Sequence, residues 1–148
     1  MRLNRLLPAG CGAAVLALCS AAPALAGGAS KPSAPVIHEK FTPLGCPGKP
    51  MTTLQIEGCA EHKVLAIDKT IDGLAAKVFA RLKGSSRATF VAASGDWLQY
   101  RNAACAAEAS IYNGGSLQPV AYANCLASID GSHVAELKRM LIALSPAG

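Results

Sequence analysis

Aromatic residues are scarce in this chain of 148 residues, where Phe, Trp and Tyr together make up 5% and tryptophan occurs once. Charged residues are also few, at 16%, whereas hydrophobic residues reach 51%. That apolar content excludes a disordered chain. Because alanine supplies much of it, and no segment alternates apolar and polar residues as a strand does, the composition favours a core of packed helices.

The chain also lacks a basic cluster and a long internal apolar run. Its formal net charge is +5, and without residues 1–26, which contain Arg2 and Arg5, 12 Lys and Arg remain against 9 Asp and Glu, a net charge of +3. Such a weak charge, with no aromatic-studded basic strand, excludes nucleic-acid binding. After residue 26 no apolar run reaches ~18 residues, so we expect no internal membrane span.

The motifs of catalysis and of metal binding are missing. The sequence has no Gly-x-Ser-x-Gly, no His-Glu-x-x-His and no phosphate-binding loop, so we do not expect an enzyme. No cysteine pair is as close as Cys-x-x-Cys, so no metal or haem cofactor is expected. Asp68 and Asp72 are four residues apart on one helix and do not face each other across a sugar bond. His38, His62 and His133 are scattered, and His133 is expected to be a half-buried core residue.

The first 26 residues predict an export signal. Two arginines are followed by an apolar stretch that ends in Ala24-Leu25-Ala26, with small residues where signal peptidase cleaves. Cys11 and Cys19 do not fit a lipoprotein signal. Pro8 and Pro23 interrupt the apolar stretch, which argues against a membrane anchor. We therefore expect a periplasmic or secreted protein after cleavage near Ala26.

Four cysteines remain after cleavage, which in a small exported domain indicates two disulfides. Three pairings of Cys46, Cys59, Cys105 and Cys125 are possible. We favour Cys46–Cys59 with Cys105–Cys125, because each bond then joins cysteines that are neighbours along the chain.

Three segments follow one another along the sequence. Residues 1–26 are the signal peptide, and residues 27–50, with five prolines and a Gly-Gly, predict a linker or loosely laid arm held near its end by Cys46. Residues 51–148 form the helical domain. Its first helix is expected to begin at an N-cap on Thr52 or Thr53 and to run about eight turns along an apolar stripe from Ile56 to Leu82.

Two further helical runs complete the domain. The second ends at Asn113-Gly114-Gly115-Ser116, where Ser116 is expected to cap the third helix and Pro119 to lie in its first turn. Asp130-Gly131-Ser132 is a possible break in that third run. The prediction is an all-α fold, with three to four helices in a small disulfide-stapled bundle preceded by the signal peptide and the Pro/Gly-rich arm.

Several residues and short motifs, in their order and spacing along the predicted helices, resemble the LprI-like lysozyme inhibitor domain family. They are Thr52/Thr53 to Cys59, Asp68, Trp97-Leu98-Gln99-Tyr100-Arg101, Cys105, Gly114-Gly115-Ser116 and Cys125. The resemblance runs from about Cys46 to Leu141. The family usually has Asp directly after the arginine, where this chain has Asn102, and Thr-x-x-Arg where it has Asp130 and His133.

The resemblance implies an inhibitor that blocks the sugar cleft of lysozyme with an exposed loop. The candidate loop residues are Asn113, Gly114, Gly115 and Ser116, with Arg101 or Tyr112 assisting. The glycines let the backbone approach another surface closely, and a tyrosine is a frequent interface anchor. Lysozyme, a protein partner, would offer its two catalytic carboxyls to hydroxyl, amide or cationic groups.

Other interpretations of the same residues stay open at this point. Trp97 and Asp68 are expected in the core, and Arg101 has a structural role if it stacks on Trp97 or reaches Asp68. The loop is also explained as a plain turn between helices. An alternative function is an envelope-associated structural or interaction protein without lysozyme activity. The sequence does not indicate the oligomeric state.

Overall fold

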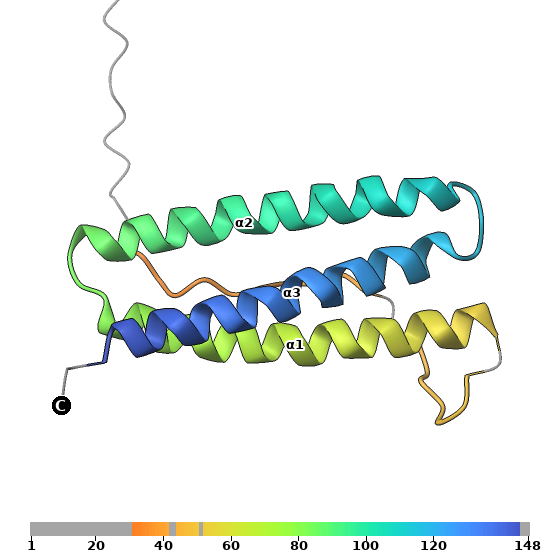
Figure 1. Ribbon diagram of the computed structural model, residues 1–148, viewed down its shortest axis with the longest axis horizontal. Coiled ribbons are helices and arrows are strands. Elements are labelled where there is room, and N and C mark those ends of the chain that lie inside the picture. The colour runs from red at the N-terminus through yellow and green to blue at the C-terminus, as the bar shows by residue number, and fades with distance from the viewer. Residues whose placement is uncertain (1–30, 42–43, 51, 146–148) are drawn as a thin grey trace, which may run out of the picture. The chain divides into compact units, whose positions relative to one another are not determined.

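The computed structural model describes residues 31–41, 44–50 and 52–145. Three long helices form the domain: α1 (Thr53–Arg81), α2 (Ser85–Ala109) and α3 (Gln118–Ala143), with a short 3-10 helix, η1 (Ser110–Tyr112), after α2. Short connections make successive helices antiparallel (Figure 1). No strand occurs within the described ranges. The all-α prediction is confirmed, whereas the expected signal peptide lies outside the described residues.

The start of α1 follows from its sequence. Thr52 is the N-cap: its hydroxyl accepts the Gln55 N–H at 3.2 Å, and the Gln55 side chain accepts the Thr52 N–H at 3.2 Å. This reciprocal pair satisfies two N–H groups that the first helical turn leaves without partners. The expected cap is confirmed at the first of the two threonines.

The third helix differs from expectation in two places. Ser116 does not cap it, because Leu117 is the N-cap residue and no side chain bonds there. The Gly115 carbonyl accepts the Gln118 N–H instead, at 3.1 Å. The helix also runs without a break through Asp130-Gly131-Ser132, where the Ser132 hydroxyl donates to the Ser128 carbonyl at 3.3 Å. Local propensity is a weak prior, and packing of this helix on both others overrides it. Pro119 lies in the first turn, as expected.

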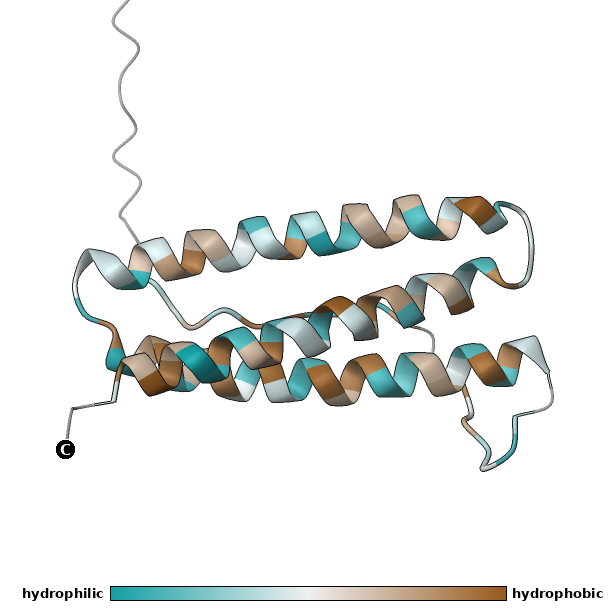
Figure 2. Ribbon diagram, viewed as in Figure 1, coloured by the Kyte–Doolittle hydropathy of each residue, from teal (hydrophilic) through white to brown (hydrophobic). Residues whose placement is uncertain are grey.

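Hydrophobic residues recur along all three helices (brown in Figure 2). The buried ones gather in two clusters along the bundle. One surrounds Val64, Cys105 and Leu126, and the other surrounds Val78 and Leu137. Each cluster draws on all three helices, so each ties the bundle together at a different level. Among the helices of the described ranges, none is long and apolar enough to cross a membrane.

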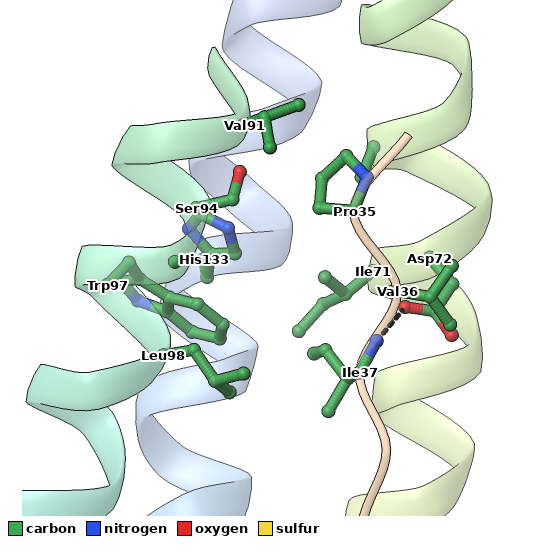
Figure 3. Close-up of a pocket in the computed structure, with 12 residues that line it drawn as sticks. Pro35, Val36, Ile37, Ile71, Asp72, Val91, Ser94, Trp97, Leu98 and His133 are labelled. Atoms are coloured by element: carbon green, nitrogen blue, oxygen red, sulfur yellow. Dashed lines mark hydrogen bonds between the residues drawn. The ribbon is translucent and has the colours of Figure 1, made fainter. Parts of the chain in front are cut away.

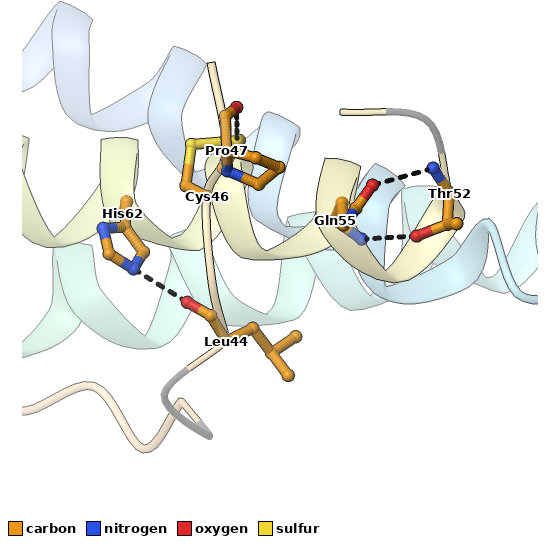
Figure 4. Close-up of a disulfide and its surroundings, with 7 residues drawn as sticks. Leu44, Cys46, Pro47, Thr52, Gln55 and His62 are labelled. Atoms are coloured by element: carbon orange, nitrogen blue, oxygen red, sulfur yellow. Dashed lines mark hydrogen bonds between the residues drawn. A yellow bond between two sulfur atoms is a disulfide. The ribbon is translucent and has the colours of Figure 1, made fainter. Parts of the chain in front are cut away.

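Both disulfides have the favoured pairing, Cys46–Cys59 and Cys105–Cys125. The first attaches the arm to the start of α1, where the Leu44 carbonyl and the His62 Nε2 atom are 2.9 Å apart (Figure 4). The second joins α2 to α3 and closes the segment of chain between them. The domain is therefore covalently fastened at two places.

The described part of the 27–50 segment lies along the helices rather than away from them. It runs beside α1 and α2 (orange in Figure 1), and the Ile37 N–H donates to Asp72 Oδ1 of α1 at 2.9 Å. Ile37 packs on one apolar cluster and Phe41 on the other. We call the described residues of this segment, 31–41 and 44–50, the arm.

Candidate functional site

The loop between α2 and α3 is built from consecutive tight turns. The Asn113 N–H donates to the Ser110 carbonyl at 3.1 Å, and the Gly115 N–H donates to the Tyr112 carbonyl at 2.8 Å. Gly114 has a φ of 75°, which L side chains rarely adopt. The Asn-Gly-Gly sequence therefore gives a compact loop with a defined backbone.

This loop carries apolar side chains that point to solvent. Ile111 is 78% exposed, Leu117 49% and Tyr112 45%. Asn113, Gly114, Gly115 and Ser116 between them are exposed as well. We call residues 110–117 the apolar loop. Sequence analysis selected Tyr112 and the four residues after it but missed Ile111 and Leu117, whose signal is that two large aliphatic residues flank a glycine turn.

The Cys105–Cys125 disulfide lies beneath the apolar loop. Both cysteines are buried, and their Cα atoms are 5.4 Å apart. The bond encloses the end of α2, η1, the turn and the start of α3, so both ends of the loop are fixed to the same apolar cluster. Such bracing lowers the entropy that the loop loses when it docks on another surface.

Arg101 is not part of this surface. Its side chain is fully buried, and it forms ion pairs with Glu39 of the arm, Asp68 of α1 (3.4 Å) and Asp130 of α3 (3.0 Å). The guanidinium carbon also lies 5.5 Å from the centre of the Trp97 ring. The structural interpretation of Arg101, contact with Trp97 and Asp68, is what the geometry shows. In this structure the cation is not accessible to a partner.

Glu39 and Asp130 were not predicted as partners of this arginine. From the sequence, Asp130 falls in a possible helix break and among the departures from the family pattern, and Glu39 is one residue of a proline-rich arm. A weak signal for Glu39 exists, because in an extended chain Ile37, Glu39 and Phe41 lie on the same face. The Asn102 side chain accepts from Arg101 Nε at 3.1 Å, so this departure keeps an acceptor beside the guanidinium.

Ionising all three carboxyl groups around one guanidinium is unfavourable, because it buries more negative than positive charge. Burial raises the pKa of Asp68 from 3.8 to about 7; the Asp130 carboxylate adds to the rise and Arg101 opposes it. Burial also raises the pKa of Asp130, and the positive charge of Arg101 again opposes the rise. Asp68 Oδ2 and Asp130 Oδ2 are buried without a donor from the described residues. A proton retained on Asp68 lowers the repulsion between the two carboxyls and leaves one fewer negative charge buried beside the guanidinium.

The remaining candidates of the sequence lie apart from each other. Asp68 is buried in the ion-pair cluster, whereas Asp72 faces the arm, so the two do not form a pair of catalytic acids. His133 is half-buried and stacks on Trp97 with ring centres 3.9 Å apart, as expected of a core histidine. Within the described part of the chain, no three His, Cys, Asp or Glu side chains are placed to hold a metal ion.

Fold and loop together define a class: a small all-α domain, stapled by two disulfides, that presents a braced apolar loop at one end. The family follows from comparison. The model of the family described as lysozyme inhibitor LprI matches residues 46–137, and the chain belongs to that family. No curated protein and no solved structure matches the chain.

Proposed function

We propose that this protein is an exported inhibitor of lysozyme that docks its apolar loop on the sugar-binding cleft of the enzyme. The family supports the activity, and the two disulfides support a life outside the cytoplasm. The observation that supports the loop is the exposure of Ile111, Tyr112 and Leu117 on a turn braced by Cys105–Cys125. No chemical step is assigned to this chain.

The loop offers two kinds of contact. Ile111 and Tyr112 provide apolar area of the kind that dominates binding energy at interfaces. Asn113 and Ser116 provide an amide and a hydroxyl that can hydrogen-bond the catalytic carboxyls of a lysozyme, and Gly114 lets the backbone come close. Arg101 acts at a distance, by holding α2 against α1 and α3 beneath the loop.

Long-range charge contributes little to this association. Without residues 1–26 the chain has 12 basic and 9 acidic residues, a net charge of +3, and animal lysozymes are basic. The two proteins therefore do not attract each other at a distance, and local complementarity has to provide the affinity. Inhibition should accordingly persist at ~0.5 M salt, at which surface charge attraction is strongly screened.

The test is a dose–response of the oxidised protein from Gly27 onward against lysozymes of several types, read as lysis of bacterial cell walls. We expect saturable inhibition, and at least a tenfold loss of potency in the double variant Ile111→Ser/Tyr112→Ser. Ile142→Ser is the control, because Ile142 is 73% exposed but lies in the last turn of α3, at the opposite end of that helix from the apolar loop.

Two results would contradict the proposal in different ways. Equal loss of potency in the Ile142 variant would move the site away from the apolar loop. An absence of inhibition at a large molar excess, with every lysozyme type, would reject the activity and favour the alternative of an envelope-associated interaction protein. In that case binding to anionic cell-wall polymers should fade as salt rises.

A further inference from the structure

A concave site lies partway along the bundle, away from the apolar loop. It is a cavity of about 210 Å³ between the arm and the three helices. The arm contributes Pro35 and Ile37, α1 contributes Ile71, and Trp97 of α2 and His133 of α3 form the opposite wall (Figure 3). Four segments distant in sequence thus enclose one space.

The cavity exists because of how the bundle is completed. An extended segment fills less volume than a helix would, and three of the residues that face the space are small. Ala75, Ser94 and Gly95 all line it, at positions where helix bundles commonly carry large apolar side chains. The wall formed by the arm is held by the hydrogen bond from the Ile37 N–H to Asp72 Oδ1 at 2.9 Å.

The lining is apolar, with polar groups that accept hydrogen bonds. The Ser94 hydroxyl already donates to the Phe90 carbonyl at 2.8 Å, so its oxygen is left as an acceptor. His133 Nδ1 is 2.9 Å from Glu136 Oε2, which in the neutral ring places the proton on Nδ1 and leaves Nε2 as an acceptor. The Asp72 carboxylate is a third acceptor at this wall.

Size and chemistry together define the occupant. A cavity of ~150 Å³ is enough for a benzene ring, so this one has room for a substituted or bicyclic ring. Trp97 adds an aromatic side chain to the lining, and its orientation is fixed by His133, stacked at 3.9 Å, and by the Arg101 guanidinium carbon, 5.5 Å from the ring centre. We propose that the cavity binds a small neutral aromatic molecule that carries a hydroxyl or amine donor, the chemistry of a phenol or an indole.

The single tryptophan makes this proposal directly measurable. In ¹⁵N-labelled protein its indole N–H gives one cross-peak, which reports on the wall of the cavity. We expect 4-methylphenol to shift that peak saturably, with a Kd of roughly 0.1–1 mM for a ligand of this size. Toluene, which has the same shape without the donor, should bind at least threefold more weakly, and benzoate should not bind beside Asp72.

Glycine variants provide the control. A side chain at Gly95 would meet no atom within 4 Å of its Cβ, so Gly95→Leu should fold and fill the cavity, weakening 4-methylphenol at least tenfold. Gly73 is equally open on α1 but does not line the cavity, so Gly73→Leu should bind as the parent does. If Gly95→Leu does not give a folded spectrum, Gly95→Ala takes its place. We expect it to bind 4-methylphenol two- to threefold more weakly than the parent.

Three outcomes would overturn the proposal. These are a shift that does not saturate, a shift unchanged by filling at Gly95, and equal binding of toluene and 4-methylphenol. Lysozyme takes no part in these measurements, so they are independent of the function proposed for the apolar loop.

Discussion

Arg101 of α2 and Asp130 of α3 meet at 3.0 Å with both side chains fully sealed from solvent. Asp68 of α1 and Glu39 of the arm reach the same guanidinium, so four segments of the chain meet at one cation. Ion pairs buried to this degree stabilise a fold only while every partner is in place.

This ion-pair cluster lies between the two apolar clusters of the bundle. On α1, Asp68 lies between Val64 of one apolar cluster and Ile71 of the other. On α3, Asp130 lies between Leu126 and Leu137 in the same way. A charged layer of this kind is satisfied in only one alignment of the helices. We therefore interpret it as the feature that sets the register of the bundle and docks the arm.

Removing the cation should be severely destabilising. In Arg101→Leu the carboxyls of Glu39, Asp68 and Asp130 lose their common partner, and we expect the free energy of unfolding to fall by about 3–5 kcal/mol. Urea denaturation of the oxidised protein measures this. The exposed Arg139 is the control, since Arg139→Leu should change stability by less than ~0.5 kcal/mol. A loss below ~1 kcal/mol for Arg101→Leu would contradict the assigned role.

Stability should also depend on pH through Asp68. The pKa of this carboxyl rises from 3.8 unfolded to about 7 folded, so the folded state holds the proton more tightly. Its contribution is fully present below pH ~4 and is lost as pH rises through 7, with a slope of at most ~1.4 kcal/mol per pH unit. Urea midpoints measured from pH 4 to pH 8 should show this decline.

Asp68→Asn separates that effect from other titrations. The amide resembles the protonated acid: it keeps an acceptor for Arg101 and a donor for Asp130. The stability of the variant should no longer decline between pH 4 and pH 7, and at pH 8 the variant should be more stable than the parent. Parallel pH profiles for the two proteins would show that Asp68 does not hold the proton.

Much of the fold could be predicted from sequence, because its signals are local. The proline-rich segment that ends at residue 50 and the threonines after it predict the start of α1. The even number of cysteines predicts two disulfides, and the preference for pairing cysteines that are neighbours along the chain selects the observed pairs. The break expected at Asp130-Gly131-Ser132 was wrong for a tertiary reason. There Asp130 is directed inward to Arg101, and the helix continues because its flanking residues are packed.

The sites were less accessible to sequence reasoning. Arg101 and Asp68 were paired correctly, since one arginine on a core-facing stripe needs a carboxylate. Glu39 lies 62 residues from Arg101, and nothing local specifies that an arm folds back over such a distance. The exposure of Ile111 and Leu117 was missed because composition alone does not distinguish an apolar residue in the core from one on a loop.

The arm should be sensitive to a single added methyl group on α1. A Cβ atom at Gly58 would lie 2.6 Å from the Gly45 carbonyl oxygen and 2.9 Å from the Leu44 Cβ. Backbone cannot yield there, because the Cys46–Cys59 bond fixes the crossing. We expect Gly58→Ala to cost about 1–3 kcal/mol in thermal or urea unfolding. Gly73→Ala, with open space around its Cβ, should instead gain about 0.5–1 kcal/mol.

The Cys105–Cys125 bond should matter for function beyond its effect on stability. Replacing both cysteines by alanine removes a link across 20 residues, a loss of about 3 kcal/mol in the chain-entropy model. Replacing Cys46 and Cys59, which are 13 residues apart, costs a similar amount in that model. If the apolar loop is the inhibitory surface, only Cys105–Cys125 braces it.

The inhibition assay separates the two disulfides. Under conditions where both variants remain folded by circular dichroism, lysozyme inhibition should fall at least fivefold without Cys105–Cys125 and stay near the parent value without Cys46–Cys59. The reverse order would place the inhibitory surface at the arm.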